Sequence, residues 1–559
     1  MTILRLLGFV IILLFPIYVG ATHVFYHNFT GYTLTGHPGE TAQLKQFNAL
    51  IVRDGRVVAV GQQQQLEAAF PHWTKRRKDL EGNYLLPGLI DAHGHVLGLG
   101  QTLQQVDLRN ATSEQHAAQL VADYAKAQPD FPWVVGRGWN QELWDSRQFP
   151  TAASLQELVQ DRPIYLSRVD GHAAWVNHKA LELAGITAAT LDPEGGEIIR
   201  DEQGEPTGVL IDNAMQLVAQ HIPPLTQAQQ QVALQQAMIH LVQQGITGVH
   251  DAGIEATTLA AYQELAARDQ LPLRIYGMLA ATEPQLPELL AAGPYHTADD
   301  KLTVRSVKIY GDGALGSRGA ALLAPYHDAP HQQGLMVTSP ERIQQLLQLI
   351  IAHGFQVNTH AIGDRANRVV LDAYEQTFAQ MGGRHLRHRI EHAQIVHPDD
   401  IPRFKALDII ASMQPTHATS DMNMAEDRLG TARIQGAYAW QTFTQQGTIV
   451  AAGSDFPVEY ANPFFGLHAA VTRQDRNNQP DDGWYAHESL TLPQALRAFT
   501  LDAAYAAGQE QQLGSLEPGK WADFIVLDQD PFAQAKTQLW HNNVLATVVA
   551  GHVVYQANQ

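Results

Sequence analysis

The chain has 559 residues, of which 45% are hydrophobic and 17% charged, and its formal net charge is -19. This length exceeds what one ordinary core needs, so we expect a barrel-sized domain with accessory domains. The acidic balance argues against a nucleic-acid partner, which needs a basic face. The sequence has no cysteine, which excludes disulfides, thiolate metal sites and cysteine nucleophiles. Any metal is therefore held by histidine, carboxylate or modified lysine.

Residues 1–21 have the layout of a secretory signal peptide. Arg5 precedes an apolar run over residues 6–19, and the small residues Gly20 and Ala21 follow it. Cleavage after Ala21 predicts an exported, periplasmic or extracellular protein. The alternative is an uncleaved segment that anchors the protein in a membrane, although the run is short for a membrane span.

Apolar runs at both ends of the chain, separated by turns, predict β-strands. The dipeptide Asp54-Gly55 between two such runs predicts a hairpin. We therefore expect one small β-sandwich domain built from residues 22–84 and 512–559. Its strands are expected over residues 24–26, 46–52, 56–61, 521–527 and 544–555.

The central region alternates β-like apolar runs with helical stretches, the pattern of a parallel α/β fold. One run, at residues 163–166, falls between Gly100 and Gly245, a stretch far longer than one βα unit needs. We assign it to an insertion at about 101–244, above the active end of a (β/α)8 TIM-type barrel that spans residues 85–511. The eight barrel strands are expected over residues 85–90, 245–250, 273–278, 304–310, 355–360, 388–392, 408–413 and 448–452.

The first barrel strand ends in His93-Gly94-His95. Alternate side chains of a strand point the same way, so both imidazoles can reach one ion. Gly94 is expected to leave space beside the metals. With 26 histidines in the chain, this pair alone is weak evidence for a ligand pair.

Four later strands carry ligand types at their carboxyl ends: Lys308, His360, His392 and Asp455. Neutral imidazoles suit zinc, and two ions at about 3.5–4 Å need an anionic bridge. Lysine provides that bridge only after CO2 carboxylates its amine to N6-carboxylysine. Asp455 would contact one ion and act as general base.

Each of these residues also has an ordinary structural interpretation. A single strand-end histidine is commonly satisfied by hydrogen bonds, a lysine in an apolar strand can snorkel, and Asp455 can cap a helix. Their joint occurrence at the ends of strands 1, 4, 5, 6 and 8 favours a metal site.

The sequence resembles the amidohydrolase superfamily, and specifically amidohydrolase family 3, which includes YtcJ-like proteins and N-substituted formamide deformylase. The resemblance rests on Pro-Gly-Leu-Ile-Asp-Ala-His-Gly-His, Thr-His-Ala-Ile-Gly-Asp, Arg-Ile-Glu-His-Ala and Gly-Ser-Asp-Phe-Pro-Val. It also rests on the longer motif at residues 307–320, on two short motifs in the insertion and on the tail at residues 513–523.

This resemblance implies a barrel with a composite β-sandwich and one or two divalent metals, for which we expect zinc. It also implies hydrolysis of C–N bonds other than peptide bonds in a small molecule, by a metal-activated hydroxide with Asp455 as general base. The alternatives are a mononuclear deaminase, which would not use Lys308, a non-catalytic exported binding protein and a membrane-tethered scaffold. The oligomeric state stays open, a homodimer included.

Six further residues are weaker candidates for lining a substrate pocket. Arg318 would bind a substrate carboxylate, and the tryptophans would favour an apolar or aromatic substrate. Loop packing, with Asp312 and Arg318 as a structural ion pair, is the alternative. The six are Trp139, His172, Trp175, Asp312, Arg318 and His417.

Overall fold

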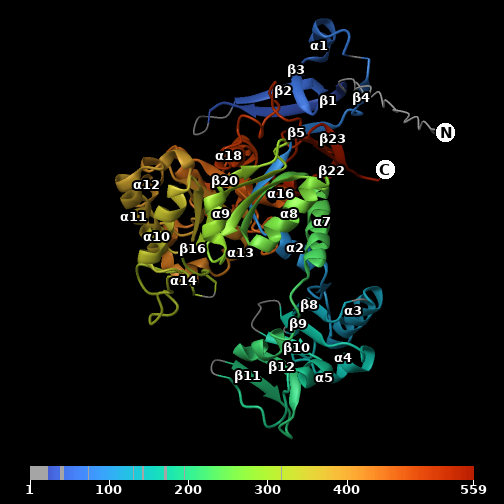
Figure 1. Ribbon diagram of the computed structural model, residues 1–559, viewed down its shortest axis with the longest axis vertical. Coiled ribbons are helices and arrows are strands. Elements are labelled where there is room, and N and C mark those ends of the chain that lie inside the picture. Colours follow the sequence, from blue (N-terminus) through green and yellow to red (C-terminus); the bar gives the residue numbers. More distant parts are fainter. Residues whose placement is uncertain are drawn as a thin grey trace, which may run out of the picture.

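The computed structural model describes residues 23–37, 43–73, 75–129, 131–141, 144–168, 173–193, 196–316 and 318–558. Three parts follow one another along the longest axis: a sheet made from both chain ends, a barrel, and an insertion (Figure 1). Within these ranges no helix has the length and apolarity that crossing a membrane requires. The signal or anchor expected over residues 1–21 lies outside the described residues.

Eight parallel strands form the barrel of the central sheet, and the short β15 (Tyr295–His296) pairs antiparallel with the fourth of them. The parallel barrel confirms the predicted fold class. Most of these strands are buried along nearly their whole length, as parallel strands covered by helices are. Their spatial order follows the chain: β6 (Leu89–Gly94), β13 (Ile246–Ile254), β14 (Arg274–Ala280), β16 (Leu302–Tyr310), β17 (Gln356–Ala361), β18 (Arg389–His392), β19 (Ile410–Met413) and β20 (Val450–Ala452).

The barrel closes between its first and last strands through the segments that follow them. The backbone N–H of Asp455 donates to the carbonyl of His93 at 2.7 Å, and that of His95 donates to Phe456 at 2.8 Å. Asp91 reinforces this seam, because its carboxylate accepts the Ser454 hydroxyl at 2.6 Å. The seam therefore carries three of the predicted ligands.

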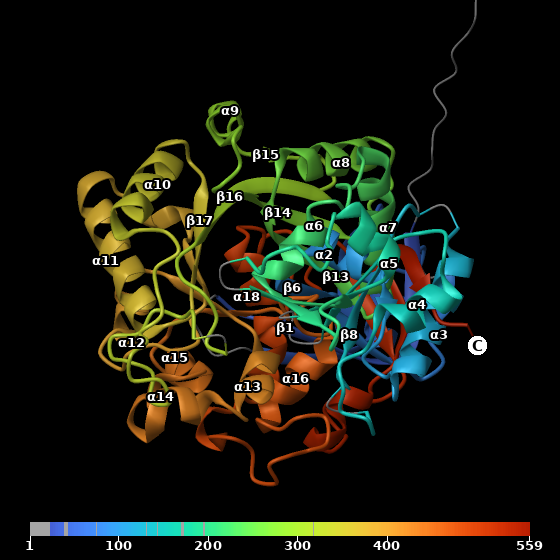
Figure 2. The ribbon, with the colours of Figure 1, turned by 90° about the horizontal axis from the view of Figure 1, so that it is seen from below.

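Helices surround the barrel on its outer side, as the view along the barrel shows (Figure 2). Their buried faces join the barrel strands in the largest apolar cluster of the described chain. The helices are α2 (Val96–Leu103), α7 (Gln227–Gln243), α8 (Ala256–Ala267), α9 (Leu286–Ala292), α10 (Pro340–Ala352), α11 (Asp364–Met381), α12 (Ile401–Ala406), α13 (Pro415–Asp421), α14 (Ala425–Arg433), α15 (Trp440–Gln445), α16 (Pro463–Thr472), α17 (Leu492–Ala498) and α18 (Leu501–Ala506).

The single strand expected over residues 85–90 is two strands. β5 (Tyr84–Pro87) pairs with the terminal sheet, whereas β6 pairs with the barrel. The chain passes from the terminal sheet to the barrel at Gly88. A glycine is needed there because a side chain would collide with Thr247 of β13. The strand that carries the histidine pair therefore begins at Leu89 and continues past His93 to Gly94.

The terminal sheet combines strands from both ends of the chain. Asp54 and Gly55 both have positive φ, which is the two-residue hairpin geometry that the Asp-Gly dipeptide predicts. Ala550 and Gly551 make the equivalent turn near the other end. The elements are β1 (His23–Thr35), β2 (Gln43–Arg53), β3 (Arg56–Gly61), α1 (Gln63–Ala69), β4 (Arg77–Asp79), β5, β21 (Phe524–Leu527), β22 (Val544–Val549) and β23 (His552–Gln556).

The insertion between α2 and α7 has its own six-stranded sheet and its own apolar clusters. It lies at the end of the barrel opposite the terminal sheet (Figure 1), and Figure 2 shows it in front of one side of the barrel opening. Its elements are β7 (Val106–Asp107), α3 (Glu114–Ala127), β8 (Val134–Trp139), α4 (Ala152–Leu158), β9 (Ile164–Arg168), β10 (Ala173–Val176), α5 (His178–Leu183), β11 (Gly196–Arg200), β12 (Pro206–Asp212) and α6 (Gln216–Ala219).

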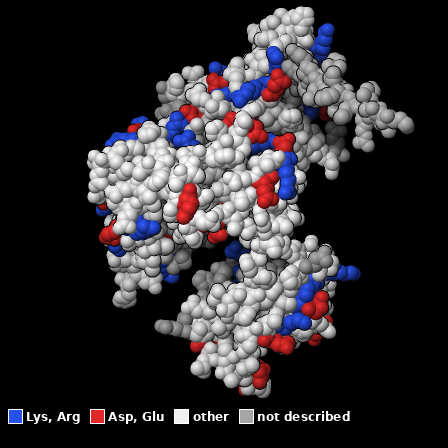
Figure 3. Space-filling model, in the orientation of Figure 1, with Lys and Arg blue, Asp and Glu red and all other residues white. Residues whose placement is uncertain are grey.

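Charged residues of both signs are interspersed on the face of the molecule drawn in Figure 3, and a hollow separates the barrel from the insertion on one side. This mixed distribution produces no continuous basic field on that face.

Candidate metal centre

Six side chains meet at the carboxyl ends of the barrel strands, the end at which barrel enzymes carry their active sites. Most of these side chains are buried, and His95 and His360 are partly exposed. The six are His93 at the end of β6, His95 directly before α2, Lys308 in β16, His360 in β17, His392 in β18 and Asp455 after β20.

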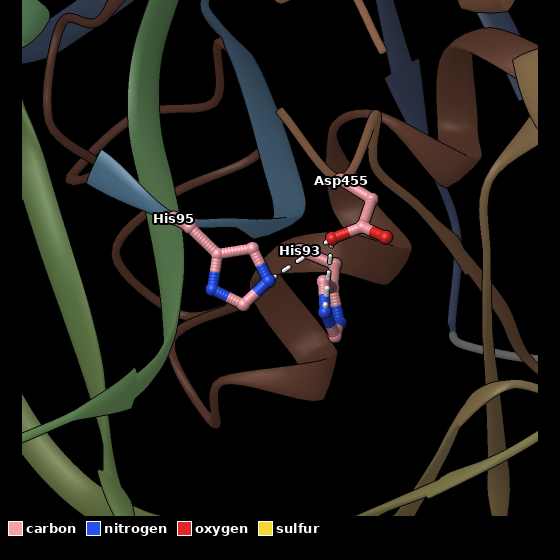
Figure 4. Close-up of side chains that lie close together, drawn as sticks. All are labelled: His93, His95 and Asp455. Atoms are coloured by element: carbon pink, nitrogen blue, oxygen red, sulfur yellow. Dashed lines mark ion pairs between the residues drawn. The ribbon is translucent and has the colours of Figure 1, made fainter. Parts of the chain in front are cut away.

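Asp455 lies beside both histidines of the first strand (Figure 4). Its Oδ1 is 3.1 Å from Nε2 of His95 and 3.6 Å from Nε2 of His93. The ligand atoms of these three residues lie within 4.8 Å of one another, so one ion can contact all three.

The other predicted ligands surround His93. The amine of Lys308 lies 3.1 Å from its Nε2, and the ring of His392 lies 4.8 Å from its ring. His360 follows, with its ring 4.5 Å from that of His392. The structure therefore brings all six predicted ligands into one contiguous group.

Three of the histidines are held so that Nε2 faces the centre. Nδ1 of His95 contacts the carbonyl of Ala252 at 2.9 Å, and Nδ1 of His392 contacts Oε1 of Gln414 at 2.8 Å. Nδ1 of His93 contacts the carboxylate of Glu391. These partners are acceptors, so Nδ1 carries the proton and Nε2 keeps the lone pair that a metal needs.

The pKa shifts of these side chains favour the protonation states in which they can bind a metal ion. Burial, together with the nearby Lys308, lowers the pKa of His93 to about 4 and that of His360 to about 3. Burial also lowers the pKa of Lys308 to about 8. Burial opposes ionisation of Asp455, but the close contact with His95 and the surrounding histidines hold its pKa well below the usual value. The group thus contains neutral imidazoles, an ionised carboxylate and an amine that deprotonates readily.

The residues fit a divalent ion. Oδ1 of Asp455 and Nε2 of His360 are buried without a hydrogen-bond partner, although buried polar atoms are normally paired. An ion in contact with such atoms would satisfy them, and imidazole nitrogen and carboxylate oxygen are ligands that zinc accepts.

His417 joins this group from α13, after the seventh strand. Its Nε2 lies 3.7 Å from Oδ2 of Asp455, and Nε2 of Gln394 lies 2.9 Å from its Nδ1. With His392 and Asp455 it forms a second cluster of atoms within ligand distance of one another. Of the weaker candidates that the structure describes, His417 and Asp312 both reach this group, since Oδ1 of Asp312 lies 3.4 Å from Nε2 of His360.

Asp312 and Arg318 do not pair with each other. The Asp312 carboxylate accepts backbone N–H groups of Ile362, Gly363 and Ala321 at 2.8–2.9 Å, so it ties together the segments after strands four and five. Arg318 instead binds Asp328 at 2.8 Å. The structural ion pair that was the alternative for Asp312 and Arg318 is therefore not formed, because each is engaged elsewhere.

The tryptophans of the insertion are core residues, which corrects their assignment to a substrate pocket. Trp139 and Trp175 have no exposed surface, and their rings pack edge to face 6.3 Å apart. The indole N–H of Trp139 donates to the carbonyl of Leu166 at 2.8 Å, and that of Trp175 donates to Thr151. A buried indole whose N–H is already hydrogen-bonded has neither exposed surface nor a free donor with which to contact a ligand. His172 lies outside the described residues.

Gly94 serves packing and does not provide space beside an ion. A side chain at position 94 would collide with the ring of Phe456. The strand alternation that points His93 and His95 to the centre points position 94 the other way.

The chain is similar to known proteins over most of its length. The sequence model described as "Amidohydrolase family" matches residues 78–555. The chain belongs to the amidohydrolase family. Over 518 residues it is 34% identical to the putative amidohydrolase YtcJ of Bacillus subtilis, with 91% of this chain and 96% of the relative covered. It is 27% identical to N-substituted formamide deformylase of Arthrobacter pascens, with 91% and 95% covered.

A solved structure gives the same fold. An uncharacterized metal-dependent hydrolase from Pyrococcus horikoshii superimposes with a TM-score of 0.76 at 27% identity, covering 92% of this chain and 99% of that structure. This amidohydrolase is therefore a metal-dependent hydrolase by family, and a divalent metal belongs to its site.

Proposed function

We propose that the protein cleaves the C–N bond of a small non-peptide amide, with Asp455 as general base. The observation that carries this proposal is the buried group in which Oδ1 of Asp455 lies 3.1 and 3.6 Å from the Nε2 atoms of His95 and His93. An ionised carboxylate beside two neutral imidazoles provides both a metal ligand and a proton acceptor.

Each side chain has a defined task in this reaction. A divalent ion, when bound, lowers the pKa of a coordinated water and polarises a carbonyl oxygen. His93, His95 and His392 would hold it through Nε2. Asp455 accepts a proton from the attacking water and returns it to the leaving nitrogen, so that an acid and an amine are released.

Lys308 would supply an anionic bridge between two ions. Its neutral amine attacks CO2 and loses a proton, which gives a carbamate with two oxygen ligands. The lowered pKa of this amine, about 8, supports the step because the attacking form is unprotonated. A zinc ion is proposed, because the donor set consists of imidazoles and a carboxylate.

The proposed substrates are N-formyl, N-acyl or cyclic amides. The deformylase relative, whose name specifies N-substituted formamides, points to this class. Arg318 does not argue for an acidic substrate, because it binds Asp328.

The test is a hydrolysis screen over these amides with purified, zinc-loaded protein. Amine release is expected from at least one class, and the Asp455→Asn variant should release it about 10²–10⁴-fold more slowly. Deamination of aminated heterocycles, with every amide left intact, would instead support the mononuclear deaminase.

We further propose that the protein is exported after cleavage at Ala21. The support is the apolar run at residues 6–19 and the small residues that follow it. Sequencing the amino terminus of the mature protein should give Thr22 as the first residue. A chain that starts at Met1 and stays in the membrane fraction would favour the anchor.

A further inference from the structure

Two charged residues of β18 lie inside the barrel without any exposed surface. Arg389 and Glu391 alternate along this strand and both point into the barrel core, where branched apolar side chains are usual. The Glu391 carboxylate contacts Nδ1 of His93, one of the proposed ligands.

The guanidinium of Arg389 binds the carboxylate of Glu391. Its Nε lies 2.7 Å from Oε1 of Glu391, and its Nη2 donates to Oε2 at 3.0 Å. The same guanidinium donates to the carbonyl of Ala92 at 2.6 Å, to the hydroxyl of Ser412 at 2.8 Å and to Nδ1 of His250 at 2.8 Å. It is therefore tied to strands β6, β13, β18 and β19 at once.

A buried ion pair of this kind commonly contributes little to the stability of the folded protein. Removing two charges from water costs more than their attraction commonly returns, and apolar replacements of similar volume are often equally stable or more stable. The contact with His93 gives the pair another use. A carboxylate has no proton to donate when ionised, so it requires Nδ1 of His93 to be the donor and leaves the lone pair on Nε2.

We propose that Arg389 and Glu391 are positioning residues for His93, which fix its tautomer and strengthen Nε2 as a metal donor. This inference rests on the proposed metal-dependent function. His95 and His392 are oriented by neutral acceptors, the Ala252 carbonyl and the Gln414 amide, so the charged partner distinguishes His93 from both. Carboxylate partners of this kind raise the basicity of a ligand imidazole, and their loss weakens metal binding about 10–100-fold.

The barrel offers a matched control. Arg274 and Asp523 form another buried arginine–carboxylate pair, with Nε to Oδ2 at 2.6 Å and Nη2 to Oδ1 at 3.0 Å. This pair joins the barrel to the terminal sheet, at the end of the strands opposite the metal centre. Asp523→Asn removes one buried carboxylate, as Glu391→Gln does, but touches no proposed ligand.

The experiment measures zinc affinity and stability in parallel. Zinc is removed from the wild-type protein and both variants, and the Kd is determined by competition with a chromophoric chelator. Thermal unfolding of the metal-free proteins is followed by circular dichroism. The double variant Arg389→Met with Glu391→Gln removes both charges and replaces Glu391→Gln if that single variant does not fold.

The expected result is a Kd about 10–100-fold higher for Glu391→Gln, with Asp523→Asn close to the wild-type Kd even if its Tm falls. An unchanged Kd in folded Glu391→Gln, or an equal loss in Asp523→Asn, would overturn the positioning role and leave the hydrolase proposal intact. Wild-type protein that binds no zinc or other divalent ion would overturn both.

Discussion

The amine of Lys308 lies 3.1 Å from Nε2 of His93, and neither side chain has more than 1% of its surface exposed. A lysine cation in this position would repel a metal ion bound to His93. The low pKa that burial gives this amine, about 8, removes the charge more easily than in an exposed lysine. The neutral or carboxylated amine is therefore the form compatible with a metal at His93.

The first prediction concerns stability and pH in the metal-free protein. Between pH 8 and 10.5 the unfolded chain keeps the Lys308 proton that the folded chain has lost, so the free energy of unfolding should rise with pH. The total contribution is roughly 3 kcal/mol. Lys308→Met should lack this rise, as measured by urea unfolding at both ends of the window. Identical pH profiles for the two proteins would count against the buried amine as its source.

The second prediction concerns the proposed base. Asp455→Asn keeps an oxygen ligand beside His93 and His95 but cannot accept a proton. It should retain bound metal and lose about 10²–10⁴-fold in kcat. Elemental analysis and steady-state kinetics on one preparation separate the two effects. Turnover at the wild-type rate would remove Asp455 from the role of base.

The third prediction concerns the ligands. His93→Ala and His392→Ala should each lower the metal bound per chain, because each removes an Nε2 donor from the centre. His353→Ala is the matched control, since this histidine is exposed at the end of α10 and its side chain contacts only the Leu349 carbonyl among the hydrogen bonds described. The control should keep the wild-type metal content. Unchanged stoichiometry in both ligand variants would contradict their assignment.

The fourth prediction concerns the insertion. Trp139 is fully buried there, so Trp139→Ala should lower the stability of the insertion by about 3–5 kcal/mol. Chemical denaturation followed by tryptophan fluorescence measures this loss. Metal content should not change, because the ring packs against Trp175 and away from the ligands. If Trp139→Ala raised KM and left stability unaltered, Trp139 would instead be assigned to the substrate pocket.

The barrel was predictable because its signals are local. Parallel strands buried on both faces are rich in apolar residues, and the apolar run over residues 85–90 leads to the histidine pair that starts at His93. The change of strand at Gly88 was not predictable in this way. It depends on Thr247, which is distant in the sequence and lies against the glycine only in the fold.

The partners of the ligands were the part that sequence reasoning missed. Gln414 and the Ala252 carbonyl orient ligands from other strands, and nothing in their own segments marks them. Glu391 did leave a signal, since two charged residues in the buried run Arg-Ile-Glu-His are costly unless they are paired. Asp312 misled because two of its three backbone donors, Ile362 and Gly363, lie 50 and 51 residues away in the sequence.

The most direct test of metal binding beside Asp455 is a crystal structure of the zinc-loaded protein with anomalous data collected at the zinc absorption edge. We predict an anomalous peak within about 2.0–2.2 Å of Nε2 of His93, Nε2 of His95 and a carboxylate oxygen of Asp455. A map of zinc-loaded, hydrolytically active protein with no peak among these three side chains would contradict it.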